Sequence, residues 1–348
     1  VDKRALVVGG GVAGMTSALG LADQGFTVHL VEKQKDLGGM ARRIRTTLEG
    51  LDVQAFLRDL IRRVYEHPLV HVSHEATITD VSGYVGSFVT TVETEGQTKT
   101  IHHGAAILAT GADEYKPAEY MYGEDDRVVT QLELEERIAL SDEVVGGARS
   151  LVMIQCVGCR QEGRDYCARV CCSQAVKNAL ALKAKHPDLA ISILYRDMRT
   201  YGFKEDYYLE AADKGVRFVR WEPEGKPEVE AAQDEGGRDI LRVTVPDAVL
   251  GQRLALDADL VALSAAVVPA AGSSRIAKFF KVPTNPDGFF QEAHVKLRPV
   301  DFAADGVFMC GASCLLYTSP SPRDCVSNLV CRLLLEKRGG GGGGGGGG

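Results

Sequence analysis

The sequence predicts an α/β protein with two parallel-sheet domains. A short apolar strand, Ala5–Val8, leads into a glycine-rich turn and then into a helix. The same order of strand, turn and helix returns near residue 150, but cysteines stand where the first turn has glycines. Because strands that alternate with helices build parallel sheets, the two patterns predict two linked Rossmann-like domains.

Length and composition fit this fold and exclude several classes of protein. The chain has 348 residues, and a single core rarely grows beyond roughly 250–300 residues. A formal net charge of −7 offers no broad cationic surface, which argues against nucleic acid as a partner. The longest apolar run, residues 258–271, is shorter than the ~20 residues that span a bilayer, so no transmembrane segment is expected. Residues 1–4 do not lead into a signal peptide, and a cytoplasmic location is predicted.

The first domain is predicted from the glycine turn onward. Residues 15–24 carry apolar residues at helical spacing, Gly25 ends this helix, and residues 27–31 form the next strand with Glu32 at its end. An amphipathic stripe predicts a helix over Val53–Glu66. A β meander then leads back to the sheet, with strands expected at residues 70–72, 76–81, 87–92 and 99–102.

The second domain repeats the pattern. Strands are expected at residues 150–155 and 190–195, with a helix over 173–185 between them, and further strands at 216–221, 241–246 and 260–264. We expect residues 1–145 and 283–314 to form the first domain and 146–282 to form a second domain inserted in it. The glycine decamer 339–348 has no side chains to bury, so residues 315–348 are predicted to be a non-native, disordered tail.

The first turn has the Gly-x-Gly-x-x-Gly pattern of a dinucleotide site. Gly9 allows the tight turn, Gly11 lets a pyrophosphate approach the backbone, and Gly14 lets the helix pack closely on the strand. The start of the helix offers unpaired N–H groups to the phosphates. Glu32 can accept hydrogen bonds from the ribose hydroxyls.

Two further patterns favour FAD over NAD. Gly38 and Gly39 follow Glu32, and Thr110 with Gly111 ends a strand after the meander. This set resembles the two-dinucleotide flavoprotein superfamily, which implies that these residues lie near the flavin. Residues 305–311 resemble the closing flavin strand of that superfamily, although Ala312 stands where an Asp is usual, and a plain core strand is the alternative. The candidate cofactor-binding residues are Gly9, Gly11, Gly14, Glu32, Lys33, Gly38, Gly39, Thr110, Gly111 and Gly311.

The second turn carries thiols. Nine cysteines are many for an intracellular protein, where clustered cysteines are more often metal-binding or catalytic than disulfide-forming. If a helix begins at Tyr166, Cys167 and Cys171 share one face, and four sulfurs can converge. A soft ligand set without histidine favours an iron–sulfur cluster over catalytic zinc. A redox dithiol of Cys156 and Cys159, a structural zinc site and a plain buried core remain alternatives.

A family resemblance rests on motifs spread along the chain: residues 9–14, 47–50, 82–86, 131–135, 199–203 and 297–301, and Cys156 with 166–172. Together they resemble the A subunit of heterodisulfide reductase and its bacterial relatives, over residues 1 to about 313. The resemblance implies an FAD protein with a thioredoxin-reductase-like fold. It also implies a [4Fe-4S] cluster bound by Cys156, Cys167, Cys171 and Cys172, whereas Cys159 matches a place often held by a non-ligand.

The resemblance implies an oxidoreductase of an electron-transfer complex. Its partners would be heterodisulfide reductase-like B and C subunits and a hydrogenase or dehydrogenase; a homodimer is also considered. In the best-known members the flavin bifurcates electrons. No catalytic acid or base stands out, and electron transfer needs none. Because family members commonly carry terminal extensions that this chain lacks, it is expected to be a fragment. A flavin-dependent disulfide oxidoreductase using Cys156 and Cys159, and a scaffold with structural flavin and zinc, are the competing hypotheses.

Overall fold

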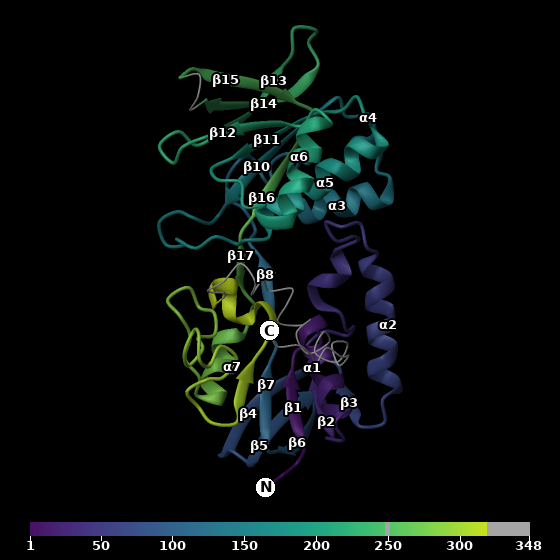
Figure 1. The fold of residues 1–348 in the computed structure, drawn as a ribbon, viewed down its shortest axis with the longest axis vertical. Helices are drawn as coiled ribbons and strands as arrows, with labels where there is room; N and C mark the ends of the chain where they lie inside the picture. Colours follow the sequence, from purple (N-terminus) through teal and green to yellow (C-terminus); the bar gives the residue numbers. More distant parts are fainter. Residues whose placement is uncertain (248–250, 319–348) are drawn as a thin grey trace, which may run out of the picture. The chain divides into compact units, whose positions relative to one another are not determined.

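The computed structural model describes residues 1–247 and 251–318 and confirms the predicted α/β class (Figure 1). The chain forms two compact units. Unit 1 consists of Val1–Arg42, Ala55–Asp113 and the chain from Pro269 onward; unit 2 consists of Arg43–Gln54 and Glu114–Val268. The chain passes between the units on either side of Arg43–Gln54 and again at β8 (Ala112–Glu114) and β17 (Val267–Pro269), which pair with each other. The tail predicted from residue 315 falls largely outside the described residues.

Unit 1 is built on a five-stranded parallel sheet in the order β18-β7-β1-β2-β3. Its strands are β1 (Ala5–Val8), β2 (Val28–Val31), β3 (Val70–Ser73), β7 (Ala105–Leu108) and β18 (Val307–Met309). Ala5 pairs with Val28 on one side and with Ala105 on the other, so β1 lies in the middle of the sheet. All four residues of β1 are buried, as is usual for a parallel strand covered on both faces.

The two faces of this sheet have separate cores. Ala5 and Val7 pack with α1 (Val12–Ala22) and α2 (Val53–Glu66), whereas Leu6 and Val8 pack with the meander and α7 (Ser273–Phe280). Alternate residues of a strand point to opposite faces, which explains this division. The meander consists of β4 (Ala76–Tyr84), β5 (Ser87–Thr94) and β6 (Gln97–His103), and short 3-10 helices η1 (Gly39–Arg43) and η3 (Gly311–Thr318) complete the unit.

Unit 2 repeats the layered plan with a parallel sheet in the order β12-β11-β10-β16-β9. Its strands are β9 (Val128–Thr130), β10 (Ser150–Val157), β11 (Ala190–Tyr195), β12 (Arg217–Arg220) and β16 (Leu260–Ala265). Its helices are α3 (Gln131–Leu140), α4 (Glu143–Gly147), α5 (Cys171–Lys185) and α6 (Glu205–Asp213), with the 3-10 turn η2 (Gly202–Lys204). An antiparallel sheet of β13 (Glu228–Gln233), β14 (Asp239–Pro246) and β15 (Arg253–Ala258) completes it.

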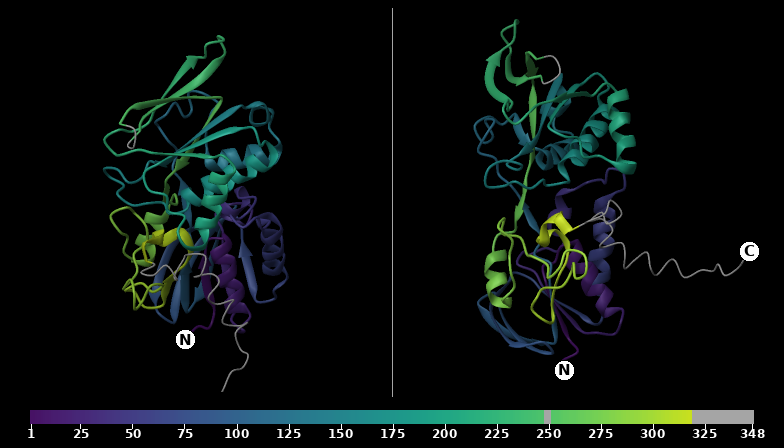
Figure 2. Two further views of the ribbon diagram at one scale, coloured as in Figure 1. Left: turned by 45° about the horizontal axis from the view of Figure 1, so that its top comes forward. Right: turned by 60° about the vertical axis from the view of Figure 1, so that its left-hand side comes forward.

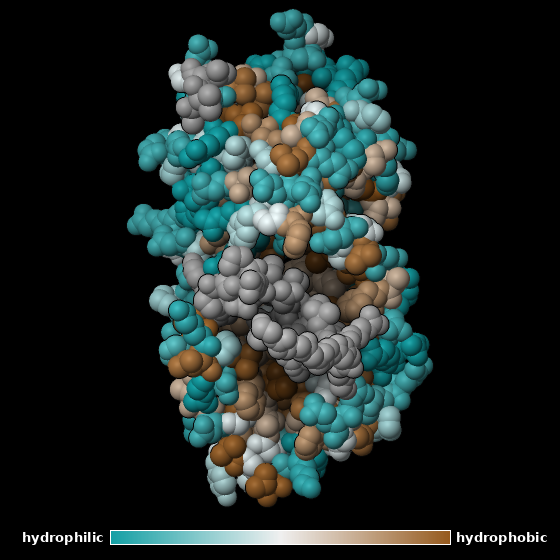
Figure 3. Space-filling model, in the orientation of Figure 1, coloured by the Kyte–Doolittle hydropathy of each residue, from teal (hydrophilic) through white to brown (hydrophobic). Residues whose placement is uncertain are grey.

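The sheet of unit 2 is also covered on both faces (Figure 2). Leu151 and Met153 of β10 pack toward α3, α5 and α6, whereas Val152 and Ile154 pack toward β14 and β15. The outer surface drawn in Figure 3 is mostly hydrophilic over this unit, with hydrophobic residues scattered singly. Within the described part of the chain, no helix is both long and apolar enough to cross a membrane.

A buried ion pair connects α3, α5 and the segment Arg43–Gln54 of unit 2. Lys177 of α5 donates to Glu135 of α3 at 2.7 Å and to the Thr46 carbonyl oxygen at 3.0 Å. The second oxygen of Glu135 accepts from the Arg45 backbone N–H at 2.6 Å. Both charged side chains are at most 10% exposed, and such a pair is tolerated in the interior only when further hydrogen bonds satisfy it. These bonds fix the segment to the two helices.

The boundaries of the two units lie earlier in the chain than the sequence-based boundaries at residues 145/146 and 282/283. Helix α3 contributes Leu134 and Ile138 to the core of unit 2, and α7 contributes Ala277 and Phe280 to the core of unit 1. The side chains of these helices therefore determine the unit to which each helix belongs.

The meander contains a buried histidine with both ring nitrogens engaged. His103 Nδ1 lies 2.9 Å from the Ala105 carbonyl oxygen and donates to it, so Nε2 is the acceptor for the Thr90 hydroxyl at 2.8 Å. Burial lowers the pKa of His103 to about 4. The neutral ring is therefore the form that this fold stabilises.

We predict that His103 makes unit 1 less stable in acid. The unfolded chain takes up a proton near pH 6.5, while the folded chain does not until about pH 4, so the free energy of unfolding falls as the pH drops through this window. The limiting loss is about 3 kcal/mol. Urea unfolding at pH 7, 6, 5 and 4.5 should show a shallower pH dependence for His103→Gln than for the unsubstituted chain. The exposed neighbour variant His102→Gln should keep the original slope, and equal slopes for all three proteins would contradict the assignment.

Candidate functional site

The glycine turn of unit 1 joins β1 to α1, and its three glycines meet different surroundings. A Cβ atom on Gly9 would lie 2.2 Å from the Ala109 carbonyl oxygen, and one on Gly14 would lie 1.8 Å from the Gly9 carbonyl oxygen. A Cβ atom on Gly11, in contrast, would meet no described residue within 4 Å. Gly9 and Gly14 are thus required by packing, whereas Gly11 leaves the backbone open to a ligand, as the motif predicts.

Glu32, the acidic residue of the motif, is hydrogen-bonded to the same turn. Glu32 is 6% exposed; its Oε2 accepts from the Gly10 N–H at 2.5 Å and its Oε1 from the Gln34 N–H at 2.7 Å. The Gly38 N–H donates to the Gly10 carbonyl oxygen at 2.8 Å, and Gly11 and Gly38 form a parallel bridge. A carboxylate has about four acceptor sites, so Glu32 can hold the turn and still accept from a ligand.

The remaining cofactor candidates lie around this turn with one exception. A Cβ on Gly39 would be 3.3 Å from Gly11, and one on Gly311 would be 2.7 Å from Ala13 of α1. Thr110 follows Ala109 and lies 3.2 Å from the Ser273 hydroxyl, and Gly111 has a φ of +71°. Lys33 is the exception, because its side chain extends along the surface to the Ala271 carbonyl oxygen at 3.4 Å.

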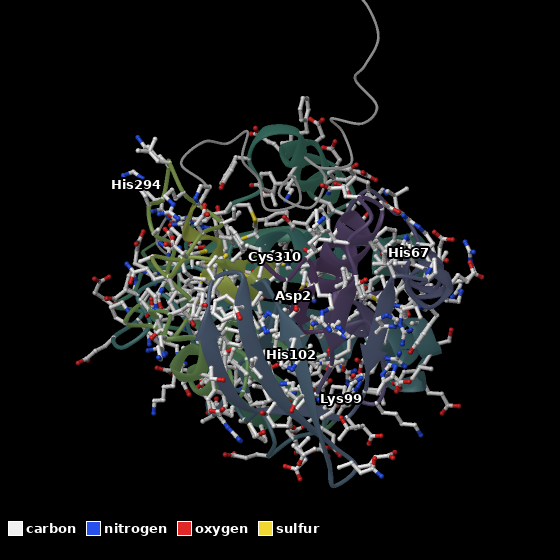
Figure 4. The ribbon with its side chains drawn as sticks, turned by 90° about the horizontal axis from the view of Figure 1, so that it is seen from below. Asp2, His67, Lys99, His102, His294 and Cys310 are labelled. Atoms are coloured by element: carbon white, nitrogen blue, oxygen red, sulfur yellow. The ribbon has the colours of Figure 1, made fainter. Side chains whose placement is uncertain are left out.

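The helix that follows the turn is open at its start. Among the residues that the structure describes, no side chain caps the N-terminus of α1, where Gly11 is the N-cap residue. Helix N-termini of this kind attract anionic groups through their free N–H groups and partial positive charge. Near the first turns of α1, Ser17 lies 3.4 Å from the Cys310 thiol, which Figure 4 shows beside this helix. The arrangement fits a dinucleotide phosphate.

Sequence reasoning missed two residues of this site. Gly10 links Glu32 to Gly38, and Ser273 contacts Thr110. Ala109, which belongs to the predicted strand end before Gly111, lies close to both Gly9 and Gly14. Gly10 occupies a variable position of the motif, so the pattern alone gave no signal for it. Ser273 comes from a distant part of the sequence, and only the fold brings it near.

The thiol turn of unit 2 follows β10 and has an unusual backbone. Cys156 has a φ of +64° where the pairing of β10 with β16 shifts register. A non-glycine residue in this region is strained, and such strain concentrates at functional sites. Gly158 has a φ of +74°, and the Tyr115 ring occupies the space that a Cβ on it would need. The Tyr115 ring therefore packs directly against the backbone of the turn at Gly158.

The thiols gather at one end of the unit 2 sheet. Cys156, Cys159, Cys171 and Cys172 are buried in one cluster with Ala168 and Ala266, and all are free thiols. Cys167 is half-buried, and its sulfur accepts from the Arg169 N–H at 3.3 Å. Helix α5 begins at Cys171 and not at Tyr166, so Cys167 lies in the preceding loop and shares no helical face with Cys171. Cys159, which is not among the predicted ligands, is nevertheless buried together with Cys156, Cys171 and Cys172.

Four of the thiols form two hydrogen-bonded pairs, and within each pair the pKa of one thiol is lowered and that of the other is raised. A hydrogen bond from Cys159, helped by the positive charges of Arg160 and Arg196, lowers the pKa of Cys156 to about 7, and the same bond and burial raise the pKa of Cys159. A hydrogen bond from Cys171 lowers the pKa of Cys172, and that bond and burial raise the pKa of Cys171. Burial also raises the pKa of Cys167. Each pair thus holds one readily formed thiolate.

The thiols do not form a preassembled site for a single ion. Among the described residues, no group of three or more His, Cys, Asp or Glu side chains is arranged so that it could hold a metal ion. A cuboidal cluster differs from a single ion because each thiolate binds a different iron atom at its own corner. Five thiols without a histidine are a soft donor set that matches iron–sulfur chemistry.

Comparisons with known proteins agree with this fold. Residues 7–59 match the family of NAD(P)-binding Rossmann-like domains. The chain is 31% identical to an iron-sulfur A subunit of the CoB–CoM heterodisulfide reductase of Methanopyrus kandleri, over 90% of this chain and 61% of the relative. It is 30% identical to the A subunit of the H(2):CoB-CoM heterodisulfide,ferredoxin reductase of Methanothermobacter thermautotrophicus, over 90% and 60%. The chain thus spans about three-fifths of the length of these relatives.

A solved structure supports the two-domain plan. Thioredoxin reductase of T. acidophilum superposes with a TM-score of 0.60 at 15% identity, covering 95% of this chain and 96% of that protein. This confirms the expectation of a thioredoxin-reductase-like fold with two Rossmann-like sheets. At this identity the likeness concerns the fold alone.

Two glycines of α1 provide a matched test of the packing. We predict that Gly14→Ala lowers the free energy of unfolding by about 1–3 kcal/mol, because its methyl group would collide with the Gly9 carbonyl oxygen. Gly20→Ala, in the same helix with open space around it, should raise the free energy by up to about 1 kcal/mol. Urea unfolding measures both. Equal effects of the two substitutions would show that the turn does not require the close approach.

Proposed function

We propose that this chain, a homologue of the heterodisulfide reductase A subunit, is an oxidoreductase that binds FAD in unit 1 and a [4Fe-4S] cluster in unit 2. In this proposal it passes electrons between partner proteins. One observation carries the proposal: the glycine turn of unit 1 is open for a dinucleotide, whereas thiols fill the corresponding turn of unit 2. The relative from M. kandleri is named an iron-sulfur subunit, which supports the assignment.

The residues proposed to hold FAD are those gathered around the start of α1. The open backbone at Gly11 and the uncapped helix would receive the pyrophosphate, and Glu32 would accept from the ribose. Gly38, Gly39, Thr110, Gly111 and Gly311 would approach the remaining parts of the molecule. Lys33 reaches a surface carbonyl oxygen instead, so we give it no part in binding. When bound, FAD supplies the exchange between two-electron and one-electron steps.

The residues proposed to hold the cluster are Cys156, Cys167, Cys171 and Cys172. Metal binding requires thiolates, and Cys156 and Cys172 are the two thiols whose pKa values are lowered. Cys167 is electrostatically coupled to both of them although it lies in a loop. Cys167 would contribute its sulfur from the loop before α5, where it accepts from the Arg169 N–H at 3.3 Å. When bound, the cluster supplies single-electron transfer.

The electron-transfer partners follow by analogy with the relatives. The protein from M. thermautotrophicus is named as one subunit of a larger reductase. We therefore propose that this chain works with heterodisulfide reductase-like B and C subunits and receives electrons from a hydrogenase or dehydrogenase. Bifurcation at the flavin would additionally require a second acceptor, which a partner protein would supply.

A second candidate function is a flavin-dependent disulfide oxidoreductase. It is favoured by the pairing of Cys156 with Cys159, because the lowered pKa of Cys156 is typical of a thiol that attacks disulfides. In that mechanism Cys156 and Cys159 alternate between a dithiol and a disulfide and bind no iron. The first candidate function does not require the Cys159 thiol, whereas the second candidate function requires it.

Cysteine variants distinguish the two candidates. After anaerobic purification we expect about four iron atoms and one flavin per chain. Cys171→Ser should lose most of the iron and keep the flavin, because the glycine turn of unit 1 does not involve this residue. Cys159→Ser should keep the iron, and Cys314→Ser, which changes a thiol of unit 1 outside the proposed cofactor contacts, serves as a control. A preparation with flavin, no iron, and a disulfide reductase activity that Cys159→Ser abolishes would favour the dithiol instead.

A further inference from the structure

A cleft of about 540 Å³ lies in unit 2 beside the thiol turn. The turn forms one wall through Cys156, Val157 and Gly158, and the ends of β11 and β12 contribute Arg196 and Trp221. Lys226 and Val229 belong to the loop and strand that follow. The lining thus combines apolar side chains with cations and with two carboxylates, Glu119 and Glu228.

Some charged side chains of the cleft form ion pairs and others do not. Glu119 accepts from the Tyr115 hydroxyl at 3.3 Å, and Glu228 is paired with Arg253 at 2.7 Å. Arg196 and Lys226, however, have no carboxylate partner among the described residues. Arg196 donates to the Arg160 carbonyl oxygen at 2.6 Å, and Lys226 lies 3.4 Å from the Gln161 side-chain oxygen. Neither cation is paired with a carboxylate of the described chain, although the charge of Arg196 also acts on the Cys156 thiol and lowers its pKa.

Trp221, which lines the same cleft, has a buried donor without a partner. The residue is 3% exposed, and its Nε1 makes no hydrogen bond to any described residue. The Arg196 guanidinium lies 5.7 Å from the centre of the Trp221 ring. Buried donors are nearly always satisfied, and an unsatisfied one points to an acceptor that binds there. An anion would satisfy Trp221 and neutralise Arg196 together.

The thiols restrict what kind of anion can bind. A dinucleotide places its pyrophosphate at the N-terminus of the helix after the first strand. Here that helix, α5, begins with Cys171 and Cys172, which are 2% and 3% exposed and occupy this position. The cations lie instead at Arg196 and Lys226, toward the ends of other strands. A compact ligand with one anionic end fits these positions better than a dinucleotide.

We propose that this cleft binds a compact organic anion through a carboxylate or phosphate group. Arg196 and Lys226 would neutralise the group, Trp221 Nε1 would donate to it, and Val157 and Val229 would contact the apolar part of the molecule. None of these three polar groups is a proposed cluster ligand, although the proposed ligand Cys156 lines the same cleft. The proposal makes unit 2 a small-molecule site in addition to an electron carrier.

Trp221 is the single tryptophan of the chain, so intrinsic tryptophan fluorescence reports on the cleft directly. The holoprotein is titrated with inorganic phosphate, citrate and ADP-ribose, each against sodium chloride at equal ionic strength. We expect phosphate or citrate to change the fluorescence with saturation, and the tighter of the two identifies the preferred group. ADP-ribose should bind no more than about tenfold more tightly than phosphate. A fluorescence change no larger than that with sodium chloride, or a strong preference for ADP-ribose, would overturn the proposal.

Variants test the assigned contacts. Lys226→Gln should weaken the tighter probe by roughly threefold to tenfold, the effect of one partly exposed charge. Trp221→Phe, followed by calorimetry, should weaken it by roughly fivefold through the lost hydrogen bond. Lys214→Gln, an exposed lysine of unit 2 outside the cleft, is the control and should leave the affinity unchanged. Iron and flavin contents should be unaltered in all three, which separates this test from that of the proposed function. Equal affinities in all variants would mean that the probe binds elsewhere.

Discussion

The contact between Gly14 and the Gly9 carbonyl oxygen determines the architecture of unit 1. Because no side chain separates them, α1 starts close to the end of β1 and points its free N–H groups past Gly11 into open space. Glu32 and Gly38 then bind the two sides of the Gly10 peptide, through its N–H and its carbonyl oxygen. A turn held on both sides stays open without a ligand. Using glycines in this turn is entropically unfavourable, because glycine loses more conformational freedom on folding than any other residue.

Unit 2 has the same sheet order around its first parallel strand, but the turn after this strand has cysteines in place of glycines. Cys156 adopts a left-handed conformation that glycine would adopt without strain, and buried thiols fill the start of α5. A residue retained in a strained conformation contributes something that glycine cannot, and for cysteine this is the sulfur. The Tyr115 ring, the register shift of β10 and the hydrogen bond from Cys159 support this conformation together.

Sequence periodicity predicted the elements that carry a strong apolar pattern. Residues 53–66 and 190–195 were predicted with the observed bounds, because one face of each is clearly apolar. The helix predicted over 173–185 corresponds to α5, which begins slightly earlier at Cys171, whereas a helix start at Tyr166 is wrong because the backbone before Cys171 is not helical. The ion pair of Lys177 with Glu135 could not be predicted either, because the two residues meet only after α3 and α5 pack. Among the site residues, the turn motif predicted the positions next to β1, whereas Gly10, Ser273 and the cations of the cleft depend on tertiary contacts.

The proton distribution among the thiols bears on how an iron–sulfur cluster would assemble in unit 2. In the apo state each of the two thiol pairs keeps a proton on the sulfur with the raised pKa, Cys159 or Cys171. Cys171 must lose this proton to become a ligand, and its position at the start of α5 favours the resulting charge through the helix dipole. Cys159 has no such helix terminus and can keep its proton while it donates to Cys156. A protonated Cys159 would then stabilise the proposed ligand Cys156 without binding iron itself, which gives a physical reason for a buried fifth thiol beside the four proposed ligands.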